Sequence, residues 1–291
     1  MHAGLVLIDK PEGWTSHDVV ARIRKVAGTR RVGHAGTLDP MATGLLVLGV
    51  ESATKLLTFI VGADKTYEAT IRLGASTITD DRESEFLSQA SRDEVAAVSE
   101  AAIRASIEKL TGDIEQVPSS VSAIKVDGVR SYAKVRGGEE VKLKARPVTV
   151  SRFEIVGEPR RVDDFIDLDV IVDCSSGTYI RALARDLGEA LGVGGHLTAL
   201  RRTRVGGYTI DQSQKLPEAT DPLNVISSFE ASKAFTTLEL DQQQVIDLRH
   251  GKRLANTNKL VGDIAAVFEG KLIAILIPSG NQLKSQVVFN D

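Results

Sequence analysis

The sequence is poor in the residues that most often mark a metal site, a disulfide or a membrane segment. It holds a single cysteine, Cys174, so no disulfide can form within the chain, which favours a reducing compartment. Its five histidines are scattered, and no His-Glu-x-x-His or paired-cysteine pattern indicates a metal site. No apolar run approaches the length needed to cross a bilayer, and the start lacks a charged-then-apolar signal pattern. We therefore expect a cytoplasmic protein without a membrane segment or a bound metal.

The chain also lacks an excess of positive charge. Its 36 lysines and arginines face 39 acidic residues, which gives a net charge of -3. Bulk charge could not hold a nucleic acid, so the basic residues would have to gather on one face. Four basic groups could do so: Arg22, Arg24, Lys25, Arg30 and Arg31; Lys142, Lys144 and Arg146; Arg201, Arg202 and Arg204; and Arg249, His250, Lys252 and Arg253. Acidic residues cluster elsewhere, at 80–85 and 163–169. A basic run is more often a solvated face than a binding site, but four separate runs of one sign make a binding face less improbable.

Length and apolar periodicity indicate one large domain and a small one. The chain has 291 residues, of which 42% are hydrophobic, so a substantial core can form. Strands are predicted at 5–8, 45–48, 67–73 and 166–173, and helices at 19–26, 95–110 and 180–191. Thr15 to Asp18 fits a capping box at the start of the first helix. Residues 76–91 are polar and predicted to form a loop, and 264–275 reads as a hairpin in a β-rich terminal domain.

The most informative stretch is the loop at 33–40, Gly-His-Ala-Gly-Thr-Leu-Asp-Pro, which precedes the apolar strand at 45–48. Its two glycines let the backbone turn tightly, and Pro40 favours an extended conformation at Asp39. A stiff loop of this kind can present one carboxylate, as covalent catalysis requires. An ordinary surface turn uses the same residue types, so composition alone does not decide between the two.

Several motifs occur in an order and spacing that resemble the TruB family of pseudouridine synthases. The matching stretches are 4–13, 33–40 continuing into 42–46, 53–55, 65–67 followed by 73–74, 174–181, and 196–202. The resemblance implies an α+β fold, with a pseudouridine synthase core whose mixed, mainly antiparallel sheet is flanked by helices. That catalytic domain would span residues 1–233, with an RNA-binding insertion at about 115–146. A small β-rich, PUA-like RNA-binding domain would span 236–291.

The same resemblance implies the reaction and the residues that carry it. A uridine at position 55, in the T loop of tRNA, would be flipped out and isomerised to pseudouridine without a guide RNA, a cofactor or a metal. Asp39 would be the essential carboxylate, Arg181 its ion-pair partner, and Tyr67 the ring that stacks on the target uracil. The implied substrate-binding residues are His34, Gly36, Leu38, Lys55, Tyr179, Ile180 and Leu200, and the implied contacts to the RNA backbone are Arg30, Arg31, Arg201 and Arg202. The expected partner is the tRNA T-arm, and the expected state is a monomer.

Other interpretations remain open from the residues alone. Tyr67 fits a core tyrosine and Arg181 fits an exposed helix arginine. Two alternative functions are a guide-RNA-dependent synthase of the same superfamily and an RNA chaperone that folds tRNA without modifying it. A third is a hydrolase of small glycosides, but such sites usually need two carboxylates, and the motifs offer only Asp39.

Overall fold

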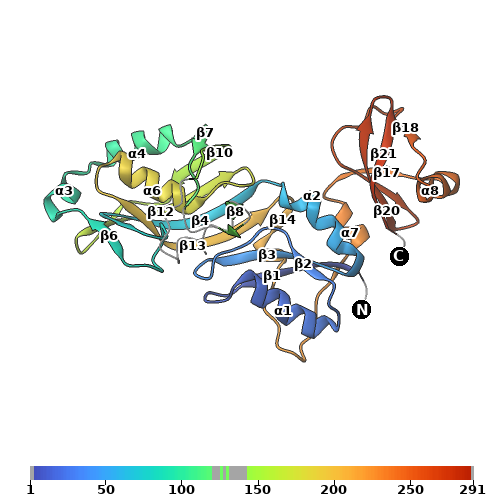
Figure 1. Ribbon diagram of the computed structural model, residues 1–291, viewed down its shortest axis with the longest axis horizontal. Helices are drawn as coiled ribbons and strands as arrows, with labels where there is room; N and C mark the ends of the chain where they lie inside the picture. Colours follow the sequence, from blue (N-terminus) through green and yellow to red (C-terminus); the bar gives the residue numbers. More distant parts are fainter. Residues whose placement is uncertain (1–2, 120–124, 127–128, 131–142, 290–291) are drawn as a thin grey trace. The chain divides into compact units, whose positions relative to one another are not determined.

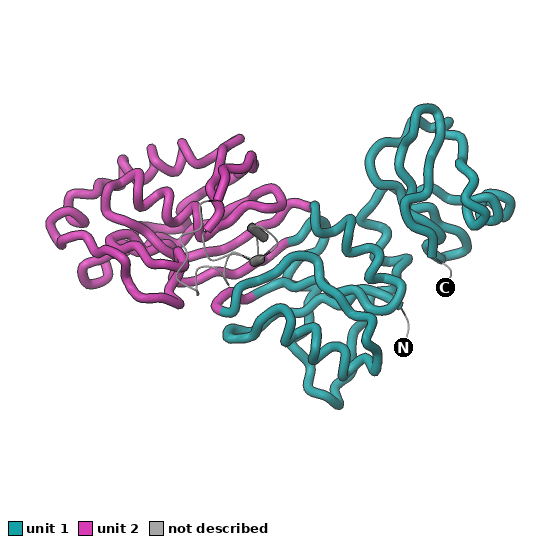
Figure 2. The backbone as a smooth tube through the Cα atoms, in the orientation of Figure 1, with its two compact units in different colours: residues 1–40, 44–62, 205–291 teal, residues 41–43, 63–204 magenta. Residues whose placement is uncertain are grey.

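The computed structural model describes residues 3–119, 125–126, 129–130 and 143–289 (Figure 1). The chain divides into two compact units (Figure 2). Unit 1 comprises Met1–Pro40, Gly44–Gly62 and Val205–Asp291, and unit 2 comprises Met41–Thr43 and Ala63–Arg204. Most of the insertion expected at about 115–146 lies outside the described residues. None of the helices within the described ranges is long and apolar enough to span a membrane.

The N-terminal part of unit 1 contains three strands of the 12-stranded sheet and one long helix. Its elements are β1 (Gly4–Lys10), α1 (Ser16–Ala27), β2 (Val32–His34), β3 (Thr43–Val50), η1 (Glu51–Leu56) and α2 (Leu57–Val61). Strand β1 pairs antiparallel with β3 along Gly44 to Val50, and the shorter β2 pairs antiparallel with Leu48 to Val50 of β3. The strands predicted at 5–8 and 45–48 are therefore confirmed, and their runs of apolar residues are buried.

Helix α1 begins at the predicted capping box. The hydroxyl of Thr15 accepts a hydrogen bond from the backbone N–H of Asp18, whose carboxylate accepts one from the N–H of Thr15 at 3.0 Å. The helix ends at Gly28, which has a φ of 64° and adopts the left-handed conformation typical of a helix C-terminus. Val19 and Ile23, one turn apart, are fully buried and fix the helix along that stripe.

The C-terminal part of unit 1 is rich in short strands. Its elements are β14 (Tyr208–Thr209), η2 (Ile210–Gln212), β15 (Gln214–Lys215), β16 (Ile226–Ser227), α7 (Ser228–Ser232), β17 (Thr236–Glu239), α8 (Gln242–Arg249), β18 (Leu254–Ala255), β19 (Ile264–Phe268), β20 (Lys271–Ser279) and β21 (Gln282–Val288). A five-stranded sheet has the order β17-β19-β20-β21-β18. The predicted hairpin is confirmed as β19 and β20, joined by Glu269 and Gly270, which both have positive φ as a tight hairpin turn requires.

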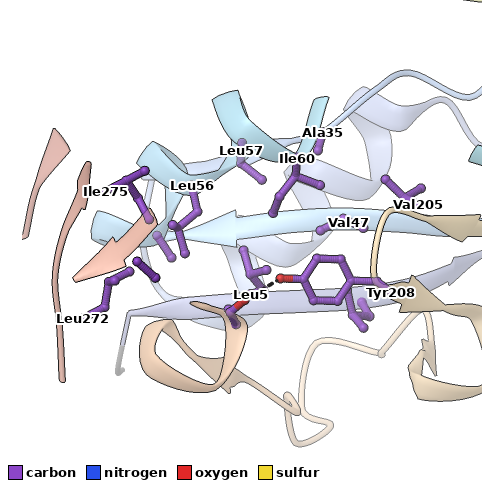
Figure 3. Close-up of a cluster of buried hydrophobic side chains, with 14 of the residues drawn as sticks. Leu5, Ala35, Val47, Leu56, Leu57, Ile60, Val205, Tyr208, Leu272 and Ile275 are labelled. Atoms are coloured by element: carbon purple, nitrogen blue, oxygen red, sulfur yellow. Dashed lines mark hydrogen bonds between the residues drawn. The ribbon is translucent and has the colours of Figure 1, made fainter. Parts of the chain in front are cut away.

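A shared apolar core joins the early strands of unit 1 to this C-terminal sheet. Leu5 on β1 belongs to the same buried cluster as Leu272 and Ile275 on β20 (Figure 3). Tyr208 completes the cluster and donates its hydroxyl to the carbonyl of Ala231 at 2.9 Å (Figure 3). Burial raises the pKa of Tyr208 to about 12. The C-terminal sheet is therefore anchored by the same core that buries the first strand.

Unit 2 also combines strands and helices. Its elements are β4 (Lys65–Leu73), β5 (Ala75–Thr77), β6 (Phe86–Gln89), α3 (Arg92–Ala97), α4 (Glu100–Lys109), β7 (Gly112–Gln116), β8 (Lys125–Val126), β9 (Val129–Arg130), β10 (Arg146–Ile155), β11 (Arg160–Val162), β12 (Phe165–Cys174), α6 (Ile180–Ala190) and β13 (Gly195–Val205). The main strands have the order β13-β4-β12-β10-β7, with antiparallel pairing from β4 to β7. Helices α4 and α6 pack against each other and against this sheet (Figure 1). The predicted α+β class with a mainly antiparallel sheet is confirmed.

Two predictions of local structure are wrong in detail. The helix predicted at 95–110 is two helices, because Ser99 adopts an extended conformation and its hydroxyl accepts a hydrogen bond from the N–H of Ala102 at 3.2 Å. A capping serine therefore starts a new helix although the apolar periodicity continues. The loop predicted at 76–91 contains β6 and most of β5, which pair with each other.

Candidate active site

The loop that carries Asp39 is built into unit 1 rather than lying on it as a loose turn. Ala35 is fully buried, and its N–H donates to the carbonyl of Val47 on β3 at 2.9 Å. Gly36 has a φ of 92°, a conformation that side chains other than glycine rarely tolerate. Leu38 is 3% exposed, so the residue just before Asp39 points inward. The surface-turn interpretation of this loop is therefore excluded.

Ser16, the first residue of α1, holds the backbone on the N-terminal side of Asp39. Its hydroxyl accepts a hydrogen bond from the N–H of Leu38 at 2.9 Å and donates one to the carbonyl of Leu38 at 3.1 Å. Ser16 is 1% exposed, so both bonds are shielded from water.

Lys10 and Gly13 hold the backbone on the other side of Asp39. The ammonium of Lys10 donates to the carbonyl of Pro40 at 3.3 Å, and also to those of Pro11 at 2.9 Å and Trp14 at 2.7 Å. The N–H of Gly13 donates to the same Pro40 carbonyl at 2.9 Å. Lys10 is fully buried, so these bonds are shielded from water. His34 adds an edge contact to His17 of α1, with ring centroids 5.8 Å apart.

Arg181 lies in the first turn of α6, as predicted, but it is only 5% exposed. Its Nη1 atom donates to the carbonyl of Thr79 at 2.7 Å and lies 3.5 Å from a carboxylate oxygen of Asp81. Asp81 is 2% exposed, so the two form a buried ion pair within unit 2. The interpretation of Arg181 as an exposed helix arginine is wrong, while its pairing with Asp39 stays a prediction.

A second arginine of α6 forms a parallel arrangement one turn later. Arg185 lies 3.3 Å from a carboxylate oxygen of Asp80 and donates to the carbonyl of Val117 at 2.7 Å. Burial raises the pKa of Asp80, against the opposing effect of the nearby charge of Arg185. Asp80 and its neighbour Asp81 are therefore buried partners of arginines rather than part of a solvated acidic face. Sequence reasoning missed this role, although two arginines spaced by four residues are a signal that two acids could face them.

The start of α6 is fixed by a residue that sequence reasoning did not single out. Gln116, at the end of β7, is 1% exposed, and its amide exchanges two hydrogen bonds with the backbone of Tyr179, at 2.8 and 3.1 Å. Tyr179 is the residue just before α6 and its side chain does not cap the helix. Near the other end, a Cβ on Gly188 would lie 2.1 Å from the backbone of Gly194, so the helix packs there at backbone distance.

Strand β4 carries Tyr67 on its buried face. Tyr67 is 8% exposed and alternates with Lys65, which is 6% exposed, so both lie on the same side of the strand. Burial lowers the pKa of Lys65 to about 8, and the charge of Arg202 contributes in the same direction. Cys174 stands opposite Lys65 in the sheet, and burial raises the pKa of its thiol to about 11.

The remaining predicted residues fall into different environments. Ile180 and Leu200 are 4% and 8% exposed, as apolar walls would be. Lys55 is exposed, but its ammonium donates to the carbonyl of Val288 at 3.0 Å and lies over the ring of Phe289 at 5.6 Å, so it contacts the C-terminal sheet of unit 1.

The predicted contacts to the RNA backbone are divided by burial. Arg30 and Arg31 are exposed, and Arg201 is half-buried with its Nη1 atom 3.3 Å from the hydroxyl of Thr43. Arg202 is only 1% exposed. Its guanidinium therefore does not lie on the surface, where the predicted contact to phosphate would need it.

Among the described residues no group of three or more His, Cys, Asp or Glu side chains could hold a metal ion, and the absence of a metal from the reaction stays a prediction.

The fold is shared with solved structures of low sequence identity. One is a chain in a structure of an H/ACA RNP bound to a substrate RNA containing 2'-deoxyuridine, with a TM-score of 0.71 and 23% identity, covering 99% of this chain and 85% of that one. Another, in a crystal structure of a Cbf5-Nop10-Gar1 complex, has a TM-score of 0.71 and 24% identity, covering 98% and 84% of the two chains. At these identities the likeness is one of fold.

Two family descriptions match the sequence directly. The N-terminal domain of TruB family pseudouridylate synthases matches residues 24–180, and the C-terminal domain of tRNA pseudouridylate synthase B matches 181–242. The fold and these matches define an enzyme that forms pseudouridine. The tRNA pseudouridine synthase B of Arthrobacter sp. (strain FB24) is 56% identical over 99% of this chain and 97% of its own length. That of Leifsonia xyli subsp. xyli is 60% identical over 96% and 90%. The chain belongs to the TruB family of pseudouridylate synthases.

Proposed function

We propose that this synthase isomerises uridine 55 in the T loop of tRNA to pseudouridine, as a monomer and without a guide RNA. Its relatives support this proposal, because they are named tRNA pseudouridine synthase B and match it over nearly their whole length. The single structural observation that carries it is the loop of Asp39, whose backbone is held on both sides by buried side chains. One firmly placed carboxylate is what this reaction needs from the protein.

The proposed reaction exchanges one bond for another within the same nucleoside. The bond between C1' of the ribose and N1 of the uracil breaks, the base turns, and C1' forms a bond to C5. C5 gives up its proton and N1 gains one, so that nothing is added or lost. Asp39 acts as an ionised carboxylate, and Arg181 is its proposed partner, since a guanidinium can hold a carboxylate both charged and oriented. Tyr67 stacks on the uracil.

The target base has to leave its stack before it can react. Flipping a nucleotide costs a few kcal/mol, and contacts to phosphates offset that cost. Arg30 and Arg31 are exposed and Arg201 is half-exposed, so these three are the proposed phosphate contacts, without Arg202. The proposed lining of the uridine pocket is His34, Gly36, Leu38, Tyr179, Ile180 and Leu200, with Lys55 as a further substrate contact.

The test is an assay with the purified chain alone. We would incubate it with an unmodified tRNA transcript in the presence of a metal chelator and map pseudouridine at single-nucleotide resolution. The expected result is one pseudouridine, at position 55, at full yield. A transcript with cytidine at position 55 is the matched control and should stay unmodified.

The two alternative functions that act on RNA give different results in this assay. Product that appears only after a guide RNA and partner proteins are added would overturn the proposal in favour of a guided enzyme. Faster folding of the transcript with no product would indicate a chaperone and would overturn it as well.

A further inference from the structure

We propose that Ser16 is a positioning residue for the reaction, because its hydroxyl fixes the peptide plane from which Asp39 projects. The inference rests on the proposed catalytic role of Asp39. It assigns a function to a side chain that carries no chemistry of its own and lies in another element, at the start of α1.

The geometry of the two hydrogen bonds is the first argument. The hydroxyl of Ser16 accepts from the N–H of Leu38 at 2.9 Å and donates to the carbonyl of Leu38 at 3.1 Å. A hydroxyl has one donor and two acceptor sites, so both bonds can form together. The Leu38 carbonyl belongs to the same planar peptide unit as the nitrogen and the Cα of Asp39. A rotation of that plane therefore moves the Cα of Asp39, and with it the carboxylate.

The rigidity of the support is the second argument. Ser16 is 1% exposed and Leu38 is 3% exposed, so water does not compete for these bonds. Ser16 is the first residue of helix α1, which the fully buried side chains of Val19 and Ile23 hold against the core. A hydroxyl on a packed helix has a fixed position, which a hydroxyl on a loop does not.

The two-sided hold on Asp39 is the third argument. Lys10 and Gly13 bind the carbonyl of Pro40, after Asp39, and Ser16 binds both backbone groups of Leu38, before it. With both neighbours fixed, few backbone states remain for Asp39. Without the Ser16 hydroxyl the N-terminal side can turn, and a displacement of about 1 Å at a reacting group can cost about 100-fold in rate.

The test compares Ser16→Ala with Ser16→Cys and with a control in the same helix. The alanine variant removes both bonds, while the cysteine variant keeps nearly the same size with a weaker donor and acceptor. Thr15→Ala is the matched control, because it removes the cap of α1 and leaves Ser16 in place. For each variant we would measure the single-turnover rate at saturating enzyme, the affinity for tRNA and the melting temperature.

We expect the single-turnover rate of Ser16→Ala to fall at least about tenfold, with tRNA affinity within about threefold of wild type. Ser16→Cys should fall between the alanine variant and wild type. Thr15→Ala should lower the melting temperature but keep the rate within about twofold of wild type. This ordering separates a positioning role from a loss of helix stability.

The inference is overturned if Ser16→Ala and Ser16→Cys both react at the wild-type rate, or if Thr15→Ala slows the reaction as much as Ser16→Ala does. The cysteine variant carries the comparison should the alanine variant fail to fold. Asp39→Asn, measured in parallel, tests the underlying proposal separately. Pseudouridine formation by Asp39→Asn would remove the proposed catalytic role of Asp39, on which this inference rests, whereas an inactive Asp39→Asn beside a fully active Ser16→Ala would remove only the role of Ser16.

Discussion

The loop that carries Asp39 and the helix that carries Arg181 are held by different physical means. In unit 1, the neighbours of Asp39 are fixed through their backbone groups, by the hydroxyl of Ser16 and the ammonium of Lys10. In unit 2, Arg181 is fixed through its own charge, by the buried carboxylate of Asp81 and a backbone carbonyl. The first support acts on the main chain, and the second acts on the functional group itself.

This difference shows two ways in which a protein can hold a charged side chain in position, one for the carboxylate of Asp39 and one for the guanidinium of Arg181. A frame that acts on the backbone fixes where the carboxylate projects from, whether the supporting group is neutral, like the Ser16 hydroxyl, or charged, like the Lys10 ammonium. A buried guanidinium has lost its water, and it needs an opposite charge nearby to remain stable. The two regions should therefore respond differently to substitution. Loss of a support in unit 1 should act mainly on geometry, and loss of one in unit 2 should act on both charge balance and stability.

The largest expected effect is that of Arg181→Met. It removes the proposed partner of Asp39 and leaves the carboxylate of Asp81, which is 2% exposed, without its guanidinium. Turnover should fall at least about 100-fold, and the free energy of unfolding should fall by about 3 kcal/mol because a buried charge loses its partner. Turnover and urea unfolding would be measured together.

Arg104→Met is the control for this substitution. Arg104 pairs with Glu100 on the exposed face of α4 in the same unit, at 2.5 Å. An exposed pair of this kind contributes less than about 0.5 kcal/mol, and turnover should not change. Equal losses of turnover and of unfolding free energy in the two variants would contradict a larger contribution from the buried pair.

Lys10→Met sharpens the other side of the comparison. It keeps the length of the side chain but leaves the carbonyls of Pro11, Trp14 and Pro40 without this donor. The free energy of unfolding should fall by about 2 kcal/mol, and turnover should fall about tenfold because the frame of Asp39 loosens. The affinity for tRNA, measured by filter binding, should change little. A loss of affinity that matched the loss of turnover would mean that Lys10 acts on RNA instead.

Gly188→Ala tests whether α6 depends on close backbone packing. The new Cβ would lie 2.1 Å from the backbone of Gly194, so the helix has to shift. The expected cost is about 2 kcal/mol in urea unfolding, the range found for an overpacked site. Gly62→Ala is the control, since no atom lies within 4 Å of its Cβ, and it should change stability by less than about 1 kcal/mol. An unchanged Gly188→Ala would show that the helix position is not fixed by this contact.

The smallest expected effect is a pH dependence at Lys65. Its pKa is lowered from 10.5 to about 8, mainly by burial. Between these two values the unfolded chain keeps the proton that the folded chain has lost, so this group makes the folded state more stable as the pH rises. The unfolding free energy of wild type should therefore rise relative to that of Lys65→Met by about 1–2 kcal/mol from pH 8 to pH 9.5.

Urea unfolding at the two pH values measures this difference. The matched control is Lys109→Met, which replaces an exposed lysine of α4 in the same unit and should show no such change. If the difference in unfolding free energy between wild type and Lys65→Met stays constant, or changes in favour of the variant, then burial does not disfavour the charged form of Lys65.

The contrast between the two regions also explains what the sequence could reveal. The capping box at Thr15 and the strand at 45–48 depend on neighbours in sequence, so their local patterns predicted these two features correctly. The partners of the arginines on α6 are about 100 residues away. A pattern of charges does not say which distant charge it will meet, so the sequence indicates an acidic cluster at 80–85 but not the arginines that Asp80 and Asp81 face.

The local sequence pattern also did not predict which basic side chains are buried. Arg202 belongs to a basic group that fits an RNA-binding face, yet its side chain is almost fully buried. The split at Ser99 has a local cause instead, because a capping hydroxyl competes with apolar periodicity and prevails there. The sequence therefore predicts elements and motifs well where neighbours decide them, and less well where tertiary contacts do.

The central claim is that Asp39 performs the chemistry while other residues hold the tRNA. Its most direct test is Asp39→Asn, a change that removes the charge and keeps the shape. The single-turnover rate of pseudouridine formation and the affinity for the same tRNA transcript would be measured on one preparation. The account predicts no product above background, with affinity within about threefold of wild type. Product at a rate near that of wild type, or a loss of binding as large as the loss of product, would contradict it.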